Sequence, residues 1–230
     1  MTQQVRFLAW RIDVQIWARV LPFALYMAFL AVEKSLADLL PSIDARWLYP
    51  VKIVVVIAAL WHYRAVYAEL FTRPNWRWNG LIAPLLGLLV FGLWINLDSG
   101  WMNLGGGAGF DPRDAAGAIE WPLVLARLAG AALVVPLMEE LFWRSFLLRW
   151  IQQPQFLELA PVQIGLRAVL ISSVLFGVEH SLWLAGIVAG LAYAWIYRAS
   201  GSLWPPIVAH AATNLVLGLW VLQTGAWQFW

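Results

Sequence analysis

The stretch AIEWPLVLARLAGAALVVPL, Ala118–Leu137, decides the fold because it is mostly apolar and just long enough to cross a membrane. A helix needs about 20 such residues to span the hydrocarbon core of a bilayer. The sequence MEELFWR, residues 138–144, follows directly and carries three charges. The stretch therefore predicts a membrane-spanning helix with ionisable side chains at its end.

The composition extends this prediction to a polytopic membrane protein. Of the 230 residues, 62% are hydrophobic, 12% are charged and 17 are tryptophan, and the mean hydropathy is +0.71. Soluble proteins carry about 25% charged residues, and tryptophan is favoured at bilayer interfaces. The absence of cysteine excludes disulfides and a thiol nucleophile. A net charge of +2 gives no argument for a nucleic acid partner.

Further apolar stretches complete an expected all-α fold, a transmembrane helix bundle of seven spans around an intramembrane cavity. Proline can break a helix, so Pro136 raises the count to eight if it separates a further helix, Met138–Gln152. We treat residues 1–230 as a single integral-membrane domain. The predicted spans are Ile16–Val32, Leu48–Trp61, Gly80–Leu97, Ala118–Leu137, Ala168–Val178, Leu184–Tyr197 and Leu203–Leu222.

The basic residues predict the orientation of the chain, because lysine and arginine accumulate on the cytoplasmic side of a membrane. The N-terminus shows no cleavable signal and is expected to be cytoplasmic, which puts the glycine-rich connector Gly100–Gly117 outside. The loops predicted on the cytoplasmic side hold Arg6, Arg11, Arg19, Arg64, Arg73, Arg77, Arg144, Arg149, Arg167 and Arg198, and those on the other side hold only Lys34, Arg46, Lys52 and Arg113.

Ionisable residues inside membrane spans are functional candidates, because they are costly to bury unpaired. The first cluster is Glu139-Glu140-Leu-Phe-Trp-Arg144. Glu140 and Arg144 face one another on a helix, so Arg144 is expected to neutralise Glu140 and leave Glu139 free to face a cavity. Such a carboxylate suits a general base; an ordinary charge pair at a helix end is the alternative.

Two further clusters follow in the C-terminal half. Phe176-Gly-Val-Glu179-His180 ends one span, and His180 can hold a proton near neutrality. Glu179 is interpreted as a solvated helix cap. His210 and Asn214 share one helical face, so both could donate to one oxygen, as an oxyanion hole requires. Hydrogen bonding between helices is the alternative for this pair.

Taken in order, Glu-Glu-x-x-x-Arg, Phe-x-x-x-His and His-x-x-x-Asn resemble the motifs of the CAAX protease and bacteriocin-processing family, which are intramembrane glutamic-type endopeptidases. The resemblance covers about Ala118–Leu222, the expected catalytic core, and leaves residues 1–117 as accessory spans and loops. It implies that Glu139 and His180 activate water while His210 and Asn214 stabilise the oxyanion. The residues implied to support the site are Glu140, Arg144 and Phe176.

The resemblance implies a membrane-associated peptide or protein substrate and no cofactor. The small size and the absence of a targeting segment predict a prokaryotic inner membrane. Protein sorting, bacteriocin maturation and self-immunity all stay open as the setting, and the oligomeric state is not predicted. Neither His-Glu-x-x-His nor Gly-x-Ser-x-Gly is present. A metal-dependent membrane hydrolase remains an alternative, because Glu, His and Asn can bind a divalent metal. A non-catalytic transport or assembly partner is the other.

Seven spans create a conflict with this assignment. Glu139 falls about 28 Å along its helix from the outer end, at 1.5 Å per residue, and His210 falls near the same, cytoplasmic face. His180 ends an outward-running helix and is expected near the opposite face. Unless its helix is tilted or dips into a cavity, or the span count is wrong by one, His180 cannot share a water with Glu139.

Overall fold

The computed structural model describes residues 3–39, 44–105 and 109–230, and these ranges form helices without a β-strand, which confirms the all-α class. Gly106 and Gly107 of the predicted connector lie outside the described residues. The helices are α1 (Gln3–Leu39), α2 (Leu48–His62), α3 (Ala83–Trp94), α4 (Trp121–Ala129), α5 (Val135–Glu140), α6 (Leu148–Trp150), α7 (Leu166–Val178), α8 (Trp183–Ser200) and α9 (Trp204–Thr224).

Five helical segments are long and apolar enough to cross a membrane, which makes the chain an integral membrane protein. α7 is a shorter apolar helix, and α8 is not among the five. The segments are Val14–Glu33, Ala45–His62, Arg77–Trp94, Trp121–Trp150 and Trp204–Thr224.

The prediction that Pro136 could end a helix is wrong. Trp121–Trp150 is one helical rod of 30 residues, in which α4, α5 and α6 are joined by the π turns Gly130–Val134 and Leu141–Leu147. A π turn shifts the hydrogen-bonding register by one residue, so a proline can follow it without interrupting the rod. An eighth span from this region is therefore absent from the structure.

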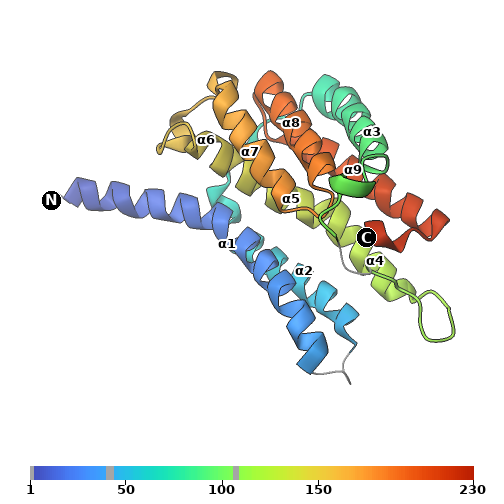
Figure 1. The fold of residues 1–230 in the computed structure, drawn as a ribbon. Coiled ribbons are helices and arrows are strands. Elements are labelled where there is room, and N and C mark those ends of the chain that lie inside the picture. Colours follow the sequence, from blue (N-terminus) through green and yellow to red (C-terminus); the bar gives the residue numbers. More distant parts are fainter. Residues whose placement is uncertain (1–2, 40–43, 106–108) are drawn as a thin grey trace.

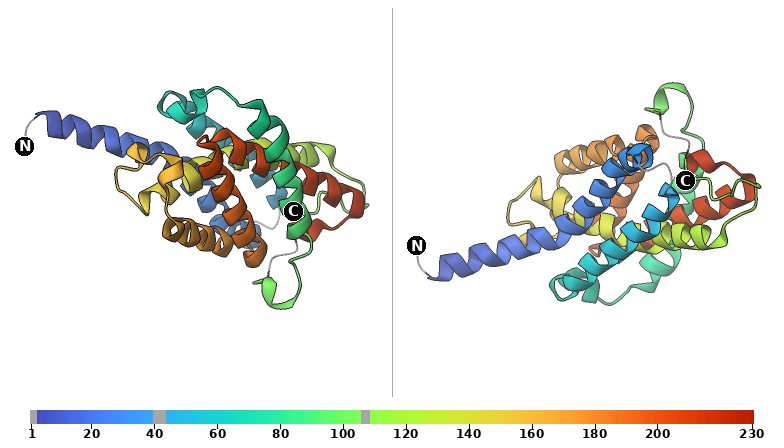
Figure 2. Two further views of the ribbon diagram at one scale, coloured as in Figure 1. Left: turned by 90° about the horizontal axis from the view of Figure 1, so that it is seen from above. Right: turned by 90° about the horizontal axis from the view of Figure 1, so that it is seen from below.

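The rod lies between two groups of helices (Figure 1). α1 and α2 pack together on one side, and α3, α7, α8 and α9 pack together on the other. The N-terminal part of α1 extends away from the bundle in both views of Figure 2. α1 changes direction part-way along its length (Figure 1), and Pro22 lies inside it, as expected for a proline kink.

Two glycines allow the closest approaches between these helices. A Cβ at Gly177 of α7 would lie 2.6 Å from the Trp183 carbonyl oxygen, and one at Gly87 of α3 would lie 2.4 Å from the Ala209 carbonyl oxygen. Close packing through small residues is a common basis of helix association in membranes. The α7–α8 and α3–α9 contacts therefore require glycine at these positions.

Several basic residues that the sequence assigned to loops are buried within helices instead. Arg19, Lys52, Arg144 and Arg149 are each at most 7% exposed. They make contacts inside the protein and carry no information about which side of the membrane a loop occupies. The loop assignment of these four residues is therefore wrong, and the cytoplasmic N-terminus stays a prediction.

Arg19 joins three separate parts of the chain. Its guanidinium forms an ion pair with Glu69, at 2.6 Å from Oε1 and 2.8 Å from Oε2, and donates to the Ser145 hydroxyl at 2.9 Å. Ser145 in turn donates to Glu69. Burial alone would raise the pKa of Glu69, but the charge of Arg19 and the hydrogen bond from Ser145 hold this pKa below its usual value.

We expect Glu69→Gln to destabilise the fold by about 3–5 kcal/mol, because removing one partner leaves the buried charge of Arg19 uncompensated. The measurement is unfolding of the purified protein in detergent near pH 7. Glu158→Gln is the control, since Glu158 is exposed and forms no ion pair within the described residues. Because the folded pKa of Glu69 is lowered, the difference between wild type and Glu69→Gln should disappear as the pH falls through that pKa. Equal stability of both variants at pH 7 would contradict this role.

Candidate active site

The structure resolves the conflict over depth in the membrane. Glu139 lies 11 residues before the end of the rod at Trp150, about 17 Å along the axis, and His180 lies about 20 Å from the start of α7 at Leu166. These two helix ends are joined by residues 151–165. Glu139 and His180 therefore reach a similar depth, and the expectation that they lie on opposite faces is wrong.

One cavity of about 200 Å³ is lined by all four residues that the sequence singled out for catalysis. They come from three places in the chain: the rod, the turn after α7, and α9. Aromatic side chains form much of the remaining wall. The lining includes Glu139, His180, His210, Asn214, Phe176, Trp94, Tyr193, Tyr26, Tyr49, Arg127, Phe229 and Trp230.

Glu140 links the rod to α9. Its Oε2 lies 3.1 Å from Arg144 Nε, as the spacing of four residues predicts, and its Oε1 lies 2.9 Å from His210 Nδ1. All three side chains are buried. The bond to His210 fixes which ring nitrogen faces the cavity, since Nδ1 is occupied and Nε2 is left. The sequence predicted the first of these contacts and missed the second.

Glu139 has fewer ion-pair and hydrogen-bond partners than the adjacent Glu140. Its Oε2 is buried without a hydrogen-bond partner in the described part of the chain, and His210 Nε2 lies 4.0 Å from it. Glu139 lines the cavity and Glu140 does not. The two adjacent carboxylates therefore have different environments: Glu140 is paired with Arg144 and His210, and Glu139 is open to the cavity.

His180 is held by the backbone of its own helix end. Its Nδ1 lies 2.7 Å from the Phe176 carbonyl oxygen, so Nδ1 carries the proton and donates it. Nε2 then has a free lone pair. The ring also contacts Phe176 and Trp94, with centroids 4.7 and 5.3 Å apart. These contacts orient a proton-accepting nitrogen within the cavity wall.

Phe176 lies at the centre of the aromatic packing. The Arg144 guanidinium lies 4.5 Å from its ring centroid, and the His210 ring lies 6.2 Å away. Phe176 is 1% exposed. It therefore contacts one residue from each of the three motifs: Arg144, His180 and His210.

Asn214 is oriented by an unusual acceptor in the rod. Its Nδ2 donates to the Ala131 carbonyl at 2.9 Å. In the π turn, the N–H of Val135 bonds to Gly130, five residues back. The corresponding partner of Ala131 would be residue 136, which is proline and has no N–H. Pro136 thus leaves this part-buried carbonyl free, and Asn214 satisfies it.

Sequence reasoning missed the contribution of Tyr193. Its ring stacks on His210 with centroids 5.0 Å apart, and its hydroxyl donates to Thr213, which donates to the Gly87 carbonyl. Both hydroxyl residues are buried. A buried tyrosine in an apolar span was a possible signal, because its hydroxyl needs a partner, but nothing in the sequence indicated which partner.

The interpretation of Glu179 as a solvated cap is only half right. Glu179 does follow the last residue of α7, but its Oε2 is buried and has no hydrogen-bond partner within the described ranges.

The described ranges contain no group of three or more His, Cys, Asp or Glu side chains placed to hold a metal ion.

The comparison with protein families agrees with the motifs. Residues 121–216 match the family model described as "Type II CAAX prenyl endopeptidase Rce1-like", a segment that includes all three motifs. The match confirms the resemblance to the CAAX protease family over this segment. The family implies a membrane-embedded protease acting on a membrane-associated protein. No curated protein and no solved structure was found to match the chain.

The link between Pro136 and Asn214 can be tested by a double-mutant cycle on stability. Asn214→Leu should cost about 1–3 kcal/mol in wild type, because the Ala131 carbonyl loses its donor. In a Pro136→Ala background the cost should fall, since residue 136 then has an N–H for this carbonyl. The measurement is the free energy of unfolding in detergent. Asn96→Leu, which removes an exposed side chain bonded to Gly92, should add to Pro136→Ala without coupling. If the costs of Asn214→Leu and Pro136→Ala also add without coupling, the link between these residues is refuted.

Proposed function

We propose that the protein is an intramembrane endopeptidase in which Glu139 and His180 activate a water molecule for attack on a peptide bond. The observation that carries this proposal is the pairing of two unengaged acceptors in one cavity. Glu139 presents an oxygen without a partner, and His180 presents Nε2 because Nδ1 is bound to Phe176. A water between them would donate to both, which aligns its oxygen lone pair for attack.

In the proposed reaction, Glu139 takes a proton from this water while the oxygen attacks the scissile carbonyl carbon. The carbonyl oxygen becomes an oxyanion. When the carbon–nitrogen bond breaks, Glu139 returns the proton to the leaving amine, so the carboxylate is regenerated. Holding water and base in a cavity enclosed by apolar helices strengthens these electrostatic interactions.

Asn214 and His210 are the proposed oxyanion donors. One N–H of the Asn214 carboxamide is bound to Ala131, which leaves the second for the substrate. His210 donates Nδ1–H to Glu140, so its Nε2 donates only when the ring carries both protons. The carboxylate of Glu140, at 2.9 Å, offsets that charge.

The supporting residues hold this geometry. Arg144 balances Glu140, and Phe176 packs between Arg144 and the two histidines. The reaction as written uses only side chains of the chain and water. We also propose that the protein lies in the inner membrane of a prokaryote, as its small size suggests, and that its N-terminus is cytoplasmic, as the remaining loop charges favour.

We expect Glu139→Gln to lower the rate of peptide cleavage by about 100- to 10,000-fold, the usual contribution of a general base, without loss of fold. A substrate is first identified by comparing membrane-fraction peptides from cells with wild-type and Glu139→Gln protein, looking for a truncated product. Cleavage rates of the purified variants are then compared.

Glu158→Gln serves as the matched control, because it removes the same charge from an exposed position. It should cleave like wild type. Circular dichroism and gel filtration check that Glu139→Gln is folded. A folded Glu139→Gln protein with full activity would end this assignment.

A further inference from the structure

The cavity has a second polar region, formed by hydrogen-bond donors that have no acceptor among the described residues. Arg127 and Trp230 both line the cavity, and the Nε of Arg127 and the Nε1 of Trp230 are buried without a partner. A buried polar group left unpaired is uncommon in native proteins and calls for an explanation. An acceptor supplied by a ligand would provide one.

This region is also positively charged. The Arg127 guanidinium lies over the rings of Tyr49 and Phe110, at 4.4 and 5.1 Å from their centroids. A second cation also contacts Tyr49: the buried Lys52 ammonium lies 5.0 Å from the centroid of the Tyr49 ring. Lys52 makes no hydrogen bond within the described chain, and its one ion-pair partner there is Glu33, at 3.7 Å.

Three acidic side chains of the neighbouring loops are paired with other arginines. Asp44 and Glu120 both bind Arg46, and Asp111 binds Arg113. Arg127 forms no ion pair with any described residue. Its guanidinium, with a fork of donors suited to a carboxylate, is therefore available to an anion.

The position of Arg127 relates this region to the proposed reaction. Arg127 and Glu139 lie on the same continuous rod, twelve residues or about 18 Å apart. An extended peptide advances about 3.3–3.6 Å per residue. No more than about five substrate residues therefore fit between a group bound at Arg127 and a carbonyl attacked at Glu139, and the length of the arginine side chain reduces this number.

We propose that Arg127 forms an anion subsite that binds a carboxylate of the peptide substrate, a few residues from the scissile bond. This inference rests on the proposed peptidase function. The carboxylate is either the one that ends a peptide chain or an aspartate or glutamate side chain at that distance. Trp230 Nε1 is a second donor to the same group.

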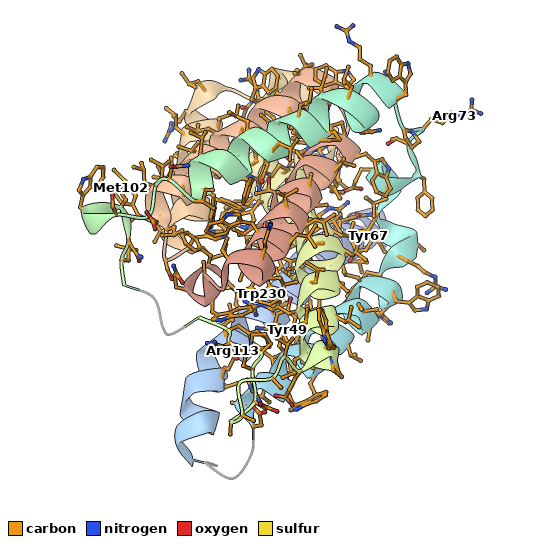
Figure 3. The ribbon with its side chains drawn as sticks, turned by 90° about the vertical axis from the view of Figure 1, so that its right-hand side faces the viewer. Tyr49, Tyr67, Arg73, Met102, Arg113 and Trp230 are labelled. Atoms are coloured by element: carbon orange, nitrogen blue, oxygen red, sulfur yellow. The ribbon has the colours of Figure 1, made fainter. Side chains whose placement is uncertain are left out.

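The test measures binding, so that it does not depend on cleavage. Glu139→Gln protein in nanodiscs of phosphatidylcholine is titrated with three dansyl-labelled heptapeptides of alanine and leucine: one with a free C-terminal carboxylate, one amidated, and one amidated with a single glutamate near its end. Each titration is repeated after adding Arg127→Gln, Arg127→Lys or Arg73→Gln. Arg73 is the matched control, because it is exposed and lies far from Tyr49 and Trp230 (Figure 3).

We expect at least one carboxylate peptide to bind about tenfold or more tightly than the neutral amide, since a hydrogen bond to a charged group contributes this much. Arg127→Gln should remove the difference, Arg127→Lys should keep part of it, and Arg73→Gln should leave it unchanged. Tighter binding of the free acid assigns the site to a chain end, and tighter binding of the glutamate peptide assigns it to a side chain.

Equal binding of all three peptides, or equal weakening of all three by Arg127→Gln, would overturn the subsite. So would loss of the carboxylate preference in nanodiscs that contain phosphatidylglycerol, because a lipid phosphate would then be the bound anion. Cleavage by the protein with intact Glu139 is measured separately. Carboxylate-dependent binding without any cleavage would refute the proposed peptidase function and leave the subsite in place.

Discussion

The pairing of both Glu140 oxygens with basic side chains determines how the rod and α9 meet. One is bound by Arg144 on the same helix and the other by His210 on α9, and the carboxylate is fully buried. A buried carboxylate is tolerated only when it is paired, so the position of α9 is tied to this group. The orientation of His210 and the shape of the cavity depend on it in turn.

Two prolines each leave a backbone carbonyl without its helical N–H donor, and a side chain from elsewhere in the chain supplies the hydrogen bond. Pro22 in α1 cannot donate to the Ala18 carbonyl four residues back, and the Tyr67 hydroxyl donates to that carbonyl at 2.6 Å. Pro136 likewise cannot donate to the Ala131 carbonyl, five residues back in the π turn, and the Asn214 carboxamide donates to that carbonyl instead. In an apolar setting an unpaired carbonyl is costly. Each proline therefore creates a specific attachment point for a side chain from a distant part of the sequence.

Contacts within one helix could be predicted from the sequence, and contacts between helices could not. The spacing of Glu140 and Arg144 predicts their ion pair, because residues four apart share a helical face. Nothing in the spacing shows that His210 binds Glu140 or that Arg19 binds Glu69, since these pairs depend on how the helices pack. The apolar pattern likewise predicted an all-α membrane fold but not the bounds of every span.

The errors have identifiable causes. A helix was allowed to end at Pro136 because proline breaks an α-helical register, and a π turn is invisible in the sequence. In the seven-span topology, the predicted span Ala118–Leu137 placed Glu139 near the membrane surface, and this created the conflict with His180. Arginines were counted as loop charges because composition does not distinguish a buried, paired arginine from an exposed one.

The length of α7 has a consequence for the membrane around the protein. Its 13 residues extend about 20 Å, against about 30 Å for the hydrocarbon core. The neighbouring rod, at about 45 Å, is longer than that core. Such hydrophobic mismatch is accommodated by helix tilt and by local thinning of the bilayer. Thinning at the end of α7 would bring the aqueous phase closer to His180, so lipid chain length would influence how readily water reaches the cavity.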